Sequence, residues 1–336
     1  MKRTQTILLG VLVLQLALAA LTLWPRSTNA NGNGGPLFPK LAASDVVALT
    51  VFDKPDTSIN LAKQGDKWVL PDAGNFPADG SKISALLTKI IGITTDRLIA
   101  TNASSQAQLQ VAPDQYVHRI DVKTTDGTTR TLYMGSSPGS GEVNVRAGDQ
   151  NNVFLGQNLN SSDASAEAGS WINPTYLTVT ATEVSSFTLK NASGQLAFSK
   201  DSSGNWTLSD RKPSETMNQS AVTSLLGLVA SLNMSAPLGT AEKPEYGMAH
   251  PGAVLTVQSK ENNQNKTVTL NVGANKNTKD NTYVVKSSDS PYYVTVSEYN
   301  VDDMIQKKRS DFLQLPPTPT PGPTSLFGLP TVTPMP

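Results

Sequence analysis

The sequence contains no cysteine and only two histidines among its 336 residues. Without cysteine the chain forms no disulfide, offers no thiol nucleophile, ligates no iron-sulfur cluster and carries no lipid-modified cysteine. Charged residues make up 16% of the chain, against about 25% in an ordinary domain. Ser, Thr, Asn, Gln and Gly take their place, a bias that indicates an exported chain facing water.

The formal net charge is zero, because 27 Lys and Arg balance 27 Asp and Glu. No basic arm is present to neutralise a series of phosphates, so we expect no nucleic-acid partner. The sequence has no P-loop, and no Gly-x-Gly-x-x-Gly turn stands between a predicted strand and a predicted helix. We therefore expect no bound nucleotide and no other cofactor.

A long apolar run follows a Lys-Arg pair at the N-terminus and extends from Ile7 to Leu23, about 25 Å as a helix. By the positive-inside rule, residues 1–6 stay in the cytoplasm and the chain after the run is translocated. Residues 7–24 are either an uncleaved membrane anchor or a signal peptide. The length of the run and its terminal tryptophan favour the anchor. Small residues suited to cleavage occur at Ala17-Leu18-Ala19 and Thr28-Asn29-Ala30.

Two low-complexity stretches flank the body of the chain. Residues 25–43 are rich in Gly, Asn and Pro, which predicts a flexible spacer. Residues 316–336 hold eight Pro and five Thr, which predicts a disordered or polyproline-like tail. This tail is either a solvated extension or a docking arm, for example through Leu326-Phe327-Gly328-Leu329.

An internal repeat with an offset close to 138 residues organises the rest of the chain. Gly65-Asp66-Lys67-Trp68 corresponds to Gly204-Asn205-Trp206, and apolar residues at helical spacing follow at 79–91 and at 218–232. The paired tryptophans are either core residues or sugar-stacking platforms, and their place beside apolar strand residues favours the core.

Strands with period-2 alternation follow each predicted helix, and the return strands end on Gly135 and Gly273. Two further strand pieces and a closing segment complete each copy. The strand pieces are Val143–Arg146 with Val153–Leu155 and Thr282–Lys286 with Tyr292–Val296, and the closing segments are Ser162–Trp171 and Tyr299–Arg309. We predict an α+β fold of two tandem modules, residues 44–180 and 181–315, each an antiparallel sheet with one main helix packed on it.

These motifs resemble the bacterial domain-of-unknown-function family 4340 over residues 44–313. The resemblance is carried by the tryptophan strand ends, the Leu-Leu helices, the Thr-Leu-x-x-Gly strands and the Tyr246-Gly247-Met248 turn, where the first copy has Leu109-Gln110-Val111. It implies an N-terminal membrane segment, an extracytoplasmic body and association with an ABC-type exporter of the gliding-motility kind. It implies no catalytic residue.

The two histidines, His118 and His250, do not occupy equivalent places in the repeat, and neither has a His or Glu partner three or four residues away. A zinc site would need several further ligands, so we interpret both as surface or turn residues. Val301-Asp302-Asp303 lacks the spaced acidic loop of a calcium site. We expect no metal.

One stretch, Gly135-Ser136-Ser137-Pro138-Gly139, matches the Gly-x-Ser-x-Gly form of a nucleophile elbow. An elbow sets its serine between a strand and a helix, whereas the residues that follow here predict a turn into another strand. The second copy has no serine at this place. We therefore interpret Ser137 as a turn residue, with serine hydrolysis as a distant alternative.

The sequence thus predicts a non-enzymatic protein, without catalytic, cofactor-binding or metal-ligating residues. We expect it to be held in the cytoplasmic membrane by Ile7 to Leu23, with its N-terminus inside and its body outside. We expect an accessory or interaction protein, with ABC-type permease and ATPase subunits as the partners that the resemblance implies. The alternative is an extracytoplasmic glycan- or peptide-binding module, secreted if the N-terminal segment is cleaved. The sequence assigns no oligomeric state.

Overall fold

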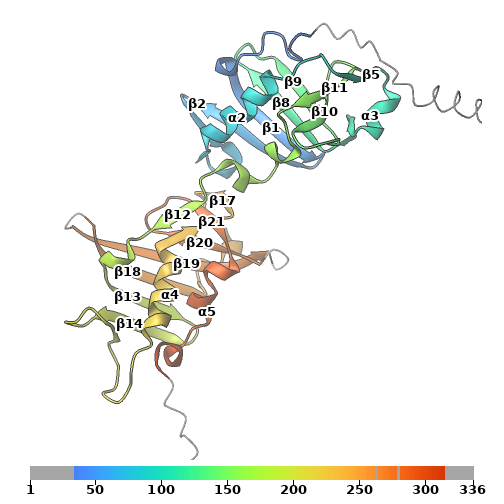
Figure 1. Cartoon of the computed structure of the whole chain (residues 1–336). Helices are drawn as coiled ribbons and strands as arrows, with labels where there is room; N and C mark the ends of the chain where they lie inside the picture. The colour runs from blue at the N-terminus through green and yellow to red at the C-terminus, as the bar shows by residue number, and fades with distance from the viewer. Residues whose placement is uncertain (1–33, 262–263, 278–280, 315–336) are drawn as a thin grey trace, which may run out of the picture. The chain divides into compact units, whose positions relative to one another are not determined.

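The structure is a computed structural model that describes residues 34–261, 264–277 and 281–314. The chain divides into two compact units: residues 34–68 with 79–167 form unit 1, and residues 69–78 with 168–314 form unit 2. Each unit is built on one large antiparallel sheet with helices packed on it (Figure 1). The fold is α+β with strands predominating.

The sheet on which unit 1 is built has nine strands in the order β4-β3-β2-β1-β8-β9-β10-β11-β5; its edge strand β4 and the last two residues of β3 fall within residues 69–78, which are grouped with unit 2. Its strands are β1 (Val46–Lys54), β2 (Thr57–Gln64), β3 (Lys67–Leu70), β4 (Phe76–Pro77), β5 (Leu98–Ala100), β8 (His118–Thr124), β9 (Thr129–Met134), β10 (Glu142–Ala147) and β11 (Val153–Gln157). A separate small hairpin joins β6 (Val111–Ala112) to β7 (Gln115–Tyr116). The short helices are α3 (Ser104–Gln108) and the 3-10 turns η1 (Ala43–Asp45) and η3 (Ser161–Asp163), while η2 (Pro71–Ala73) falls within the residues grouped with unit 2.

The helix predicted at 79–91 is α2 (Gly80–Ile91). Asp79 is its N-cap, since the carboxylate accepts the Ser81 N–H at 3.0 Å. The apolar stripe of α2 packs on the sheet and is almost fully buried. Its members are Ile83, Leu86, Leu87 and Ile90.

Part of the predicted spacer belongs to unit 1. Leu37, Phe38 and Leu41 are buried at 2%, 8% and 6% exposure, and the Leu37 N–H donates to the Ile93 carbonyl at 2.8 Å. The prediction of a flexible stretch up to residue 43 therefore differs from the structure. The Gly, Asn and Pro content of residues 25–43 predicts a flexible stretch, but three apolar side chains within it are buried in the core.

Unit 2 carries an eight-stranded sheet in the order β15-β14-β13-β18-β19-β20-β21-β17. Its strands are β13 (Val184–Asn191), β14 (Gly194–Lys200), β15 (Trp206–Leu208), β17 (Ala236–Gly239), β18 (Ala253–Glu261), β19 (Gln264–Asn277), β20 (Thr282–Ser287) and β21 (Tyr293–Ser297). A two-stranded sheet pairs β12 (Thr175–Thr178) with β16 (Ser231–Asn233). The short helices are α5 (Asp302–Gln306) and the 3-10 turns η4 (Ala168–Trp171), η5 (Ala181–Glu183), η6 (Pro244–Tyr246), η7 (Glu298–Asn300) and η8 (Arg309–Phe312).

The second predicted helix is α4 (Gln219–Ala230), capped by the Asn218 side chain, which accepts the Ala221 N–H at 3.2 Å. It ends before Leu232, because residues 231–233 form β16 and pair with β12. The same pairing places residues 168–180 in unit 2. The division of the chain therefore falls at 167/168 rather than at the predicted 180/181.

The core of unit 2 is aromatic. Phe187 and Phe198 stack with their centroids 4.4 Å apart, and Trp206 and Phe312 meet them edge-on. Trp206 is 7% exposed and Trp68 in unit 1 is 8% exposed. The prediction that both tryptophans are core residues is confirmed.

The two sheets arrange their strands in the same order. Apart from the additional edge strand β4 in the first sheet, each has three antiparallel strands, then a helix, then four antiparallel strands that continue from the first strand, and one short strand at the far edge. The glycines predicted to end the return strands also match in their close contacts, although Gly135 directly follows β9 whereas Gly273 lies within β19, where the pairing with β20 shifts register. A Cβ on Gly135 would lie 2.1 Å from the Leu109 carbonyl oxygen, and one on Gly273 would lie 2.0 Å from the Tyr246 carbonyl oxygen. Only glycine allows this approach.

Within the residues that the structure describes, no helix has the length and apolarity to cross a membrane. The predicted anchor, Ile7 to Leu23, lies outside those residues, as does the predicted tail at 316–336.

Candidate functional site

Ser137 lies in an exposed turn between β9 and β10. Its hydroxyl has the carbonyl oxygens of Gly139, at 2.8 Å, and Glu142 as acceptors. The residues after the turn form β10, from Glu142 onward, so the serine does not precede the helix that a nucleophile elbow requires. The structure places Ser137 as a turn residue.

The two histidines lie in different units. His118, on β8 of unit 1, has its Nδ1 2.8 Å from Asp53 Oδ1, and the same carboxylate oxygen accepts the Ala166 N–H at 3.0 Å. Asp53 thus joins β1, β8 and the closing segment of unit 1. His250 lies in an exposed turn of unit 2, where its N–H donates to the Gly247 carbonyl.

Among the described residues, no group of three or more His, Cys, Asp or Glu is placed to hold a metal ion. The acidic pair at the start of α5 is engaged within its own helix. Asp302 accepts a hydrogen bond from the Gln306 amide, and Asp303 lies 3.5 Å from the Lys307 ammonium group.

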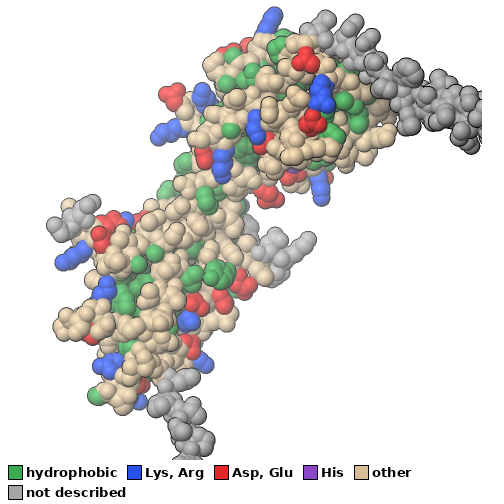
Figure 2. Space-filling model, viewed as in Figure 1, with side chains coloured by type: hydrophobic (Ala, Val, Ile, Leu, Met, Phe, Trp, Pro, Cys, Tyr) green, Lys and Arg blue, Asp and Glu red, His purple; other side chains and the backbone are tan. Residues whose placement is uncertain are grey.

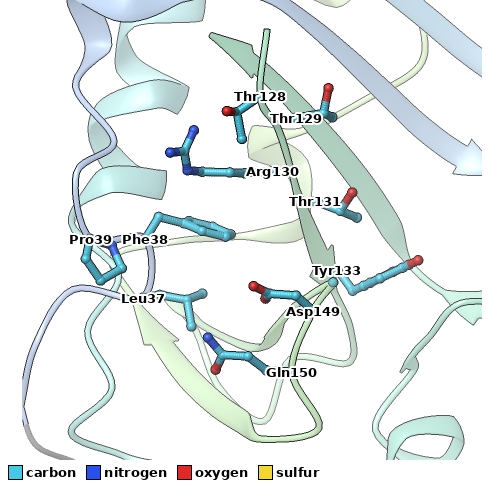
Figure 3. A pocket seen from close by; sticks show the side chains of 11 residues that line it. Leu37, Phe38, Pro39, Thr128, Thr129, Arg130, Thr131, Tyr133, Asp149 and Gln150 are labelled. Atoms are coloured by element: carbon cyan, nitrogen blue, oxygen red, sulfur yellow. The ribbon is translucent and has the colours of Figure 1, made fainter. Parts of the chain in front are cut away.

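A pocket of about 430 Å³ opens in unit 1 beside the N-terminal half of β9. We call it the β9 pocket. It is lined by Leu37, Phe38, Pro39, Thr128, Thr129, Arg130, Thr131, Tyr133, Gly148, Asp149 and Gln150. Figure 3 shows Arg130, Asp149 and Gln150 extending toward the segment that carries Leu37 and Phe38, while the ring of Tyr133 points away.

The β9 pocket contains one side chain of each charge. Arg130 donates from Nη1 to Thr124 Oγ1 at 3.2 Å. Asp149 stands on the turn that follows β10. In the part of the chain that the structure describes, no ion pair engages either side chain. The pocket therefore presents a guanidinium and a carboxylate that do not neutralise each other.

The turn bearing Asp149 is fixed from beneath by Arg146, which is 3% exposed. Its guanidinium donates to the Val111 carbonyl at 2.8 Å and to the carbonyls of Gly148 and Gln150 at 3.3 and 3.0 Å. Burial lowers the pKa of Arg146, partly offset by Tyr133 and the Asp149 carboxylate. Arg146 is thus a positioning residue for one wall of the pocket.

The other wall is an open strand edge. β9 pairs with β8 from Thr129 to Met134, but with β10 only from Leu132 onward. The Thr131 carbonyl accepts the Gly148 N–H at 2.8 Å on the β10 side. Because backbone groups alternate between the two sides of a strand, the N–H and C=O of Thr129 point to that same side, where no described strand pairs with them. The pocket thus also offers a backbone donor and acceptor.

A second hollow lies on unit 2, over α4 and α5. This acidic groove, of about 800 Å³, is lined by Ser224, Gly227, Leu228, Glu298, Tyr299, Asp302, Asp303 and Gln306. Figure 2 shows acidic and hydrophobic side chains next to one another on this face. Tyr299 is 79% exposed, a high value for a large aromatic side chain.

The comparisons with known proteins identify a family. The model described as Domain of unknown function (DUF4340) matches residues 68–251 and 216–314. The chain belongs to this family. The two overlapping matches confirm the resemblance drawn from the sequence motifs, and they include β9, the residues of the acidic groove, Gly135 and Gly273. No curated protein and no solved structure was found to match the chain.

Sequence reasoning missed both hollows. Arg130 and Asp149 stand 19 residues apart in the sequence, and only the turn after β10 brings them to one pocket. The sequence signal for the groove is the acidic pair Asp302-Asp303, whose spacing excludes a calcium loop but does not indicate a groove.

Proposed function

We propose that this chain is a non-enzymatic, membrane-tethered extracytoplasmic accessory protein that docks onto a partner through the acidic groove of unit 2. The observation that carries this proposal is the high exposure of the Tyr299 side chain in the acidic groove. Exposed hydrophobic surface rimmed by polar residues is typical of interaction sites, and aromatic residues are enriched among the side chains that dominate binding energy. Tyr299 and Leu228 supply the apolar surface of the groove.

The charge around Tyr299 defines the partner chemistry. Glu298, Asp302 and Asp303 line the groove, and Lys307 lies against Asp303 at its end. A complementary segment carries Lys or Arg beside an apolar residue, since opposite potentials steer association and fix its register. In the proposed setting, this segment belongs to an extracytoplasmic loop of an ABC-type permease, and the ATPase is another chain. The N-terminal apolar run would hold the protein beside that permease.

The two modules suit a scaffold. We interpret the shared strand order and the paired glycines as a tandem duplication, in which neither the Ser137 turn nor the His118–Asp53 pair is repeated. Duplication of a sheet module without a repeated candidate catalytic group increases the surface available for binding and supplies no second reaction centre. The Ser137 hydroxyl hydrogen-bonds within its turn, and the Asp53 carboxylate accepts a hydrogen bond from the Ala166 backbone N–H. These contacts favour structural roles for both residues.

The proposal is tested by photo-crosslinking in the native host. The full-length chain carries a photoreactive phenylalanine analogue at position 299, and a matched control carries it at Ile99, the exposed apolar residue of unit 1 at 46% exposure. We expect a crosslink from position 299 to a Lys- or Arg-bearing segment of a membrane permease, and none from position 99. Crosslinks of equal yield from both positions, or none from 299, would contradict docking at the groove.

The β9 pocket favours a second candidate, a ligand-binding module. Its volume lies within the roughly 300–1,000 Å³ of small-molecule sites, and its polar groups converge on an apolar floor. A ligand that binds the folded chain raises its unfolding temperature. Screening saccharides and peptides for such a shift tests this candidate, and it is refuted if Arg130→Gln leaves every observed shift unchanged.

A further inference from the structure

We propose that the β9 pocket binds a short peptide with free termini, whose carboxylate pairs with Arg130, whose ammonium group pairs with Asp149 and whose backbone pairs with the edge of Thr129. This inference rests on the second candidate function, ligand binding in unit 1. It adds the chemical class of the ligand.

The two charges select a ligand that carries both signs. Arg130 and Asp149 line one pocket, and neither forms an ion pair with the other or with another described residue, although Asp126 interacts electrostatically with Arg130 and Arg146 with Asp149. A guanidinium forms two parallel hydrogen bonds with a carboxylate, and a carboxylate accepts readily from an ammonium group. A neutral glycan would cover both charges without pairing them, which costs free energy. A zwitterion gives each charge a partner.

The open edge of β9 selects a peptide among zwitterions. The N–H and C=O of Thr129 point to the side that β10 leaves unpaired. An extended peptide adds to such an edge through main-chain hydrogen bonds, the mode known as β-augmentation. Only about one residue of edge is open, because Gly148 already donates to Thr131 at 2.8 Å. The peptide is therefore short.

The floor of the pocket limits the side chains. Leu37 and Phe38 are held against the core at 2% and 8% exposure, and Pro39 continues the apolar surface. A volume of about 430 Å³ lies toward the lower end of small-molecule sites. Small apolar side chains suit this floor, so tri-alanine is the probe of choice.

The experiment is isothermal titration calorimetry of the full-length chain in detergent with tri-alanine, N-acetyl-tri-alanine and tri-alanine amide. The variants are Arg130→Gln and Asp149→Asn, with Arg97→Gln as the matched control, because Arg97 is a surface arginine of unit 1 outside the pocket, 46% exposed and paired with Glu142. Unchanged circular dichroism of each variant establishes that it is folded.

We expect tri-alanine to bind the wild type. Each of the two pocket variants should bind tri-alanine with an affinity about ten- to a hundredfold lower. Arg130→Gln should have no further effect on the amide, nor Asp149→Asn on the acetylated peptide, because each cap removes the charge that the side chain would pair. Arg97→Gln should bind as the wild type does.

Capped peptides that bind as tightly as tri-alanine would overturn the proposal. So would a wild type that does not bind tri-alanine. Maltotriose distinguishes a failure of the peptide inference from a failure of ligand binding in general. If maltotriose raises the unfolding temperature of the wild type but not of Arg130→Gln, and tri-alanine raises neither, ligand binding stands and the peptide inference fails. If neither ligand binds, the peptide inference fails and the pocket has no demonstrated ligand, while docking through Tyr299 is unaffected.

Discussion

Replacing Gly273 with alanine tests the close approach between a glycine and a neighbouring backbone carbonyl that occurs in both units. The added Cβ would lie 2.0 Å from the Tyr246 carbonyl oxygen and 2.9 Å from Met248 Cε. Ordinary C···O contacts are about 3.3 Å or longer, so the two backbones must separate by about 1.3 Å. Tyr246 resists this movement because it is 1% exposed and packs against Val284 and Tyr293.

Overpacking of this kind costs about 1–3 kcal/mol, and a contact with backbone belongs at the upper end. We expect Gly273→Ala, and Gly135→Ala in unit 1, each to lower the free energy of unfolding by about 2–3 kcal/mol. The melting temperature then falls by roughly 4 °C or more. Thermal unfolding followed by circular dichroism measures the shift.

A third glycine supplies the control. A Cβ on Gly227 meets nothing within 4 Å, and this residue lies inside α4, where alanine is favoured over glycine by about 1 kcal/mol. Gly227→Ala should therefore raise the melting temperature. Melting temperatures of Gly135→Ala and Gly273→Ala at or above that of the wild type would refute the reasoning.

Three further predictions concern polar residues. Arg309 donates to Glu215 at 2.7 and 2.9 Å and, together with the Lys212 N–H, lowers the pKa of that carboxyl from 4.5 to about 2. Since the folded pKa is the lower one, this stabilisation is complete above pH 4.5 and is lost as pH falls toward 2. Glu215→Gln should reduce the loss of unfolding free energy between pH 4.5 and pH 2, as measured by unfolding at a series of pH values. A loss equal to that of the wild type would contradict the contribution of this ion pair. Arg146→Lys should lower stability by about 2 kcal/mol or more, because carbonyls buried beneath the turn lose their donors; a melting temperature equal to the wild type would show that the turn does not depend on the guanidinium. Ser137→Ala should leave any esterase activity of the chain unchanged, and abolition of such activity would restore the hydrolase alternative.

The regular part of the fold was predictable from periodicity. Leu86-Leu87 and Leu225-Leu226 mark the buried faces of α2 and α4, and the alternating strands around Ile120 and Leu255 lie in the large sheets. These elements are long enough for their apolar pattern to be read locally. The tryptophan strand ends followed from the same pattern.

The short edge elements were not predictable. β5 and β17 close the far edges of the sheets, yet they have only three and four residues, too few for a periodic pattern. Leu37 and Phe38 were missed because their neighbours are Gly and Pro, and composition outweighed two apolar residues. What places these segments is tertiary pairing, such as the Leu37 N–H with the Ile93 carbonyl, which leaves no mark in the local sequence.

The β9 pocket was unpredictable for a related reason. Its charged residues come from a strand and from a turn, and the turn is held by Arg146, whose place inside an apolar strand gave no hint that it binds carbonyls of residues 148 and 150. The acidic groove was visible in composition at Asp302 and Asp303. Its use depends on the exposure of Tyr299, which sequence alone does not give.

Affinity purification tests the proposed accessory role most directly. The full-length chain, tagged at its C-terminus, is purified from gently solubilised membranes of its own host, and mass spectrometry identifies both the bound proteins and the N-terminal residue. We predict recovery of an ABC-type permease and its ATPase with a chain that retains Met1, and loss of both partners from Tyr299→Ser but not from Ile99→Ser. A chain that arrives alone and begins near Asn31 would contradict the account.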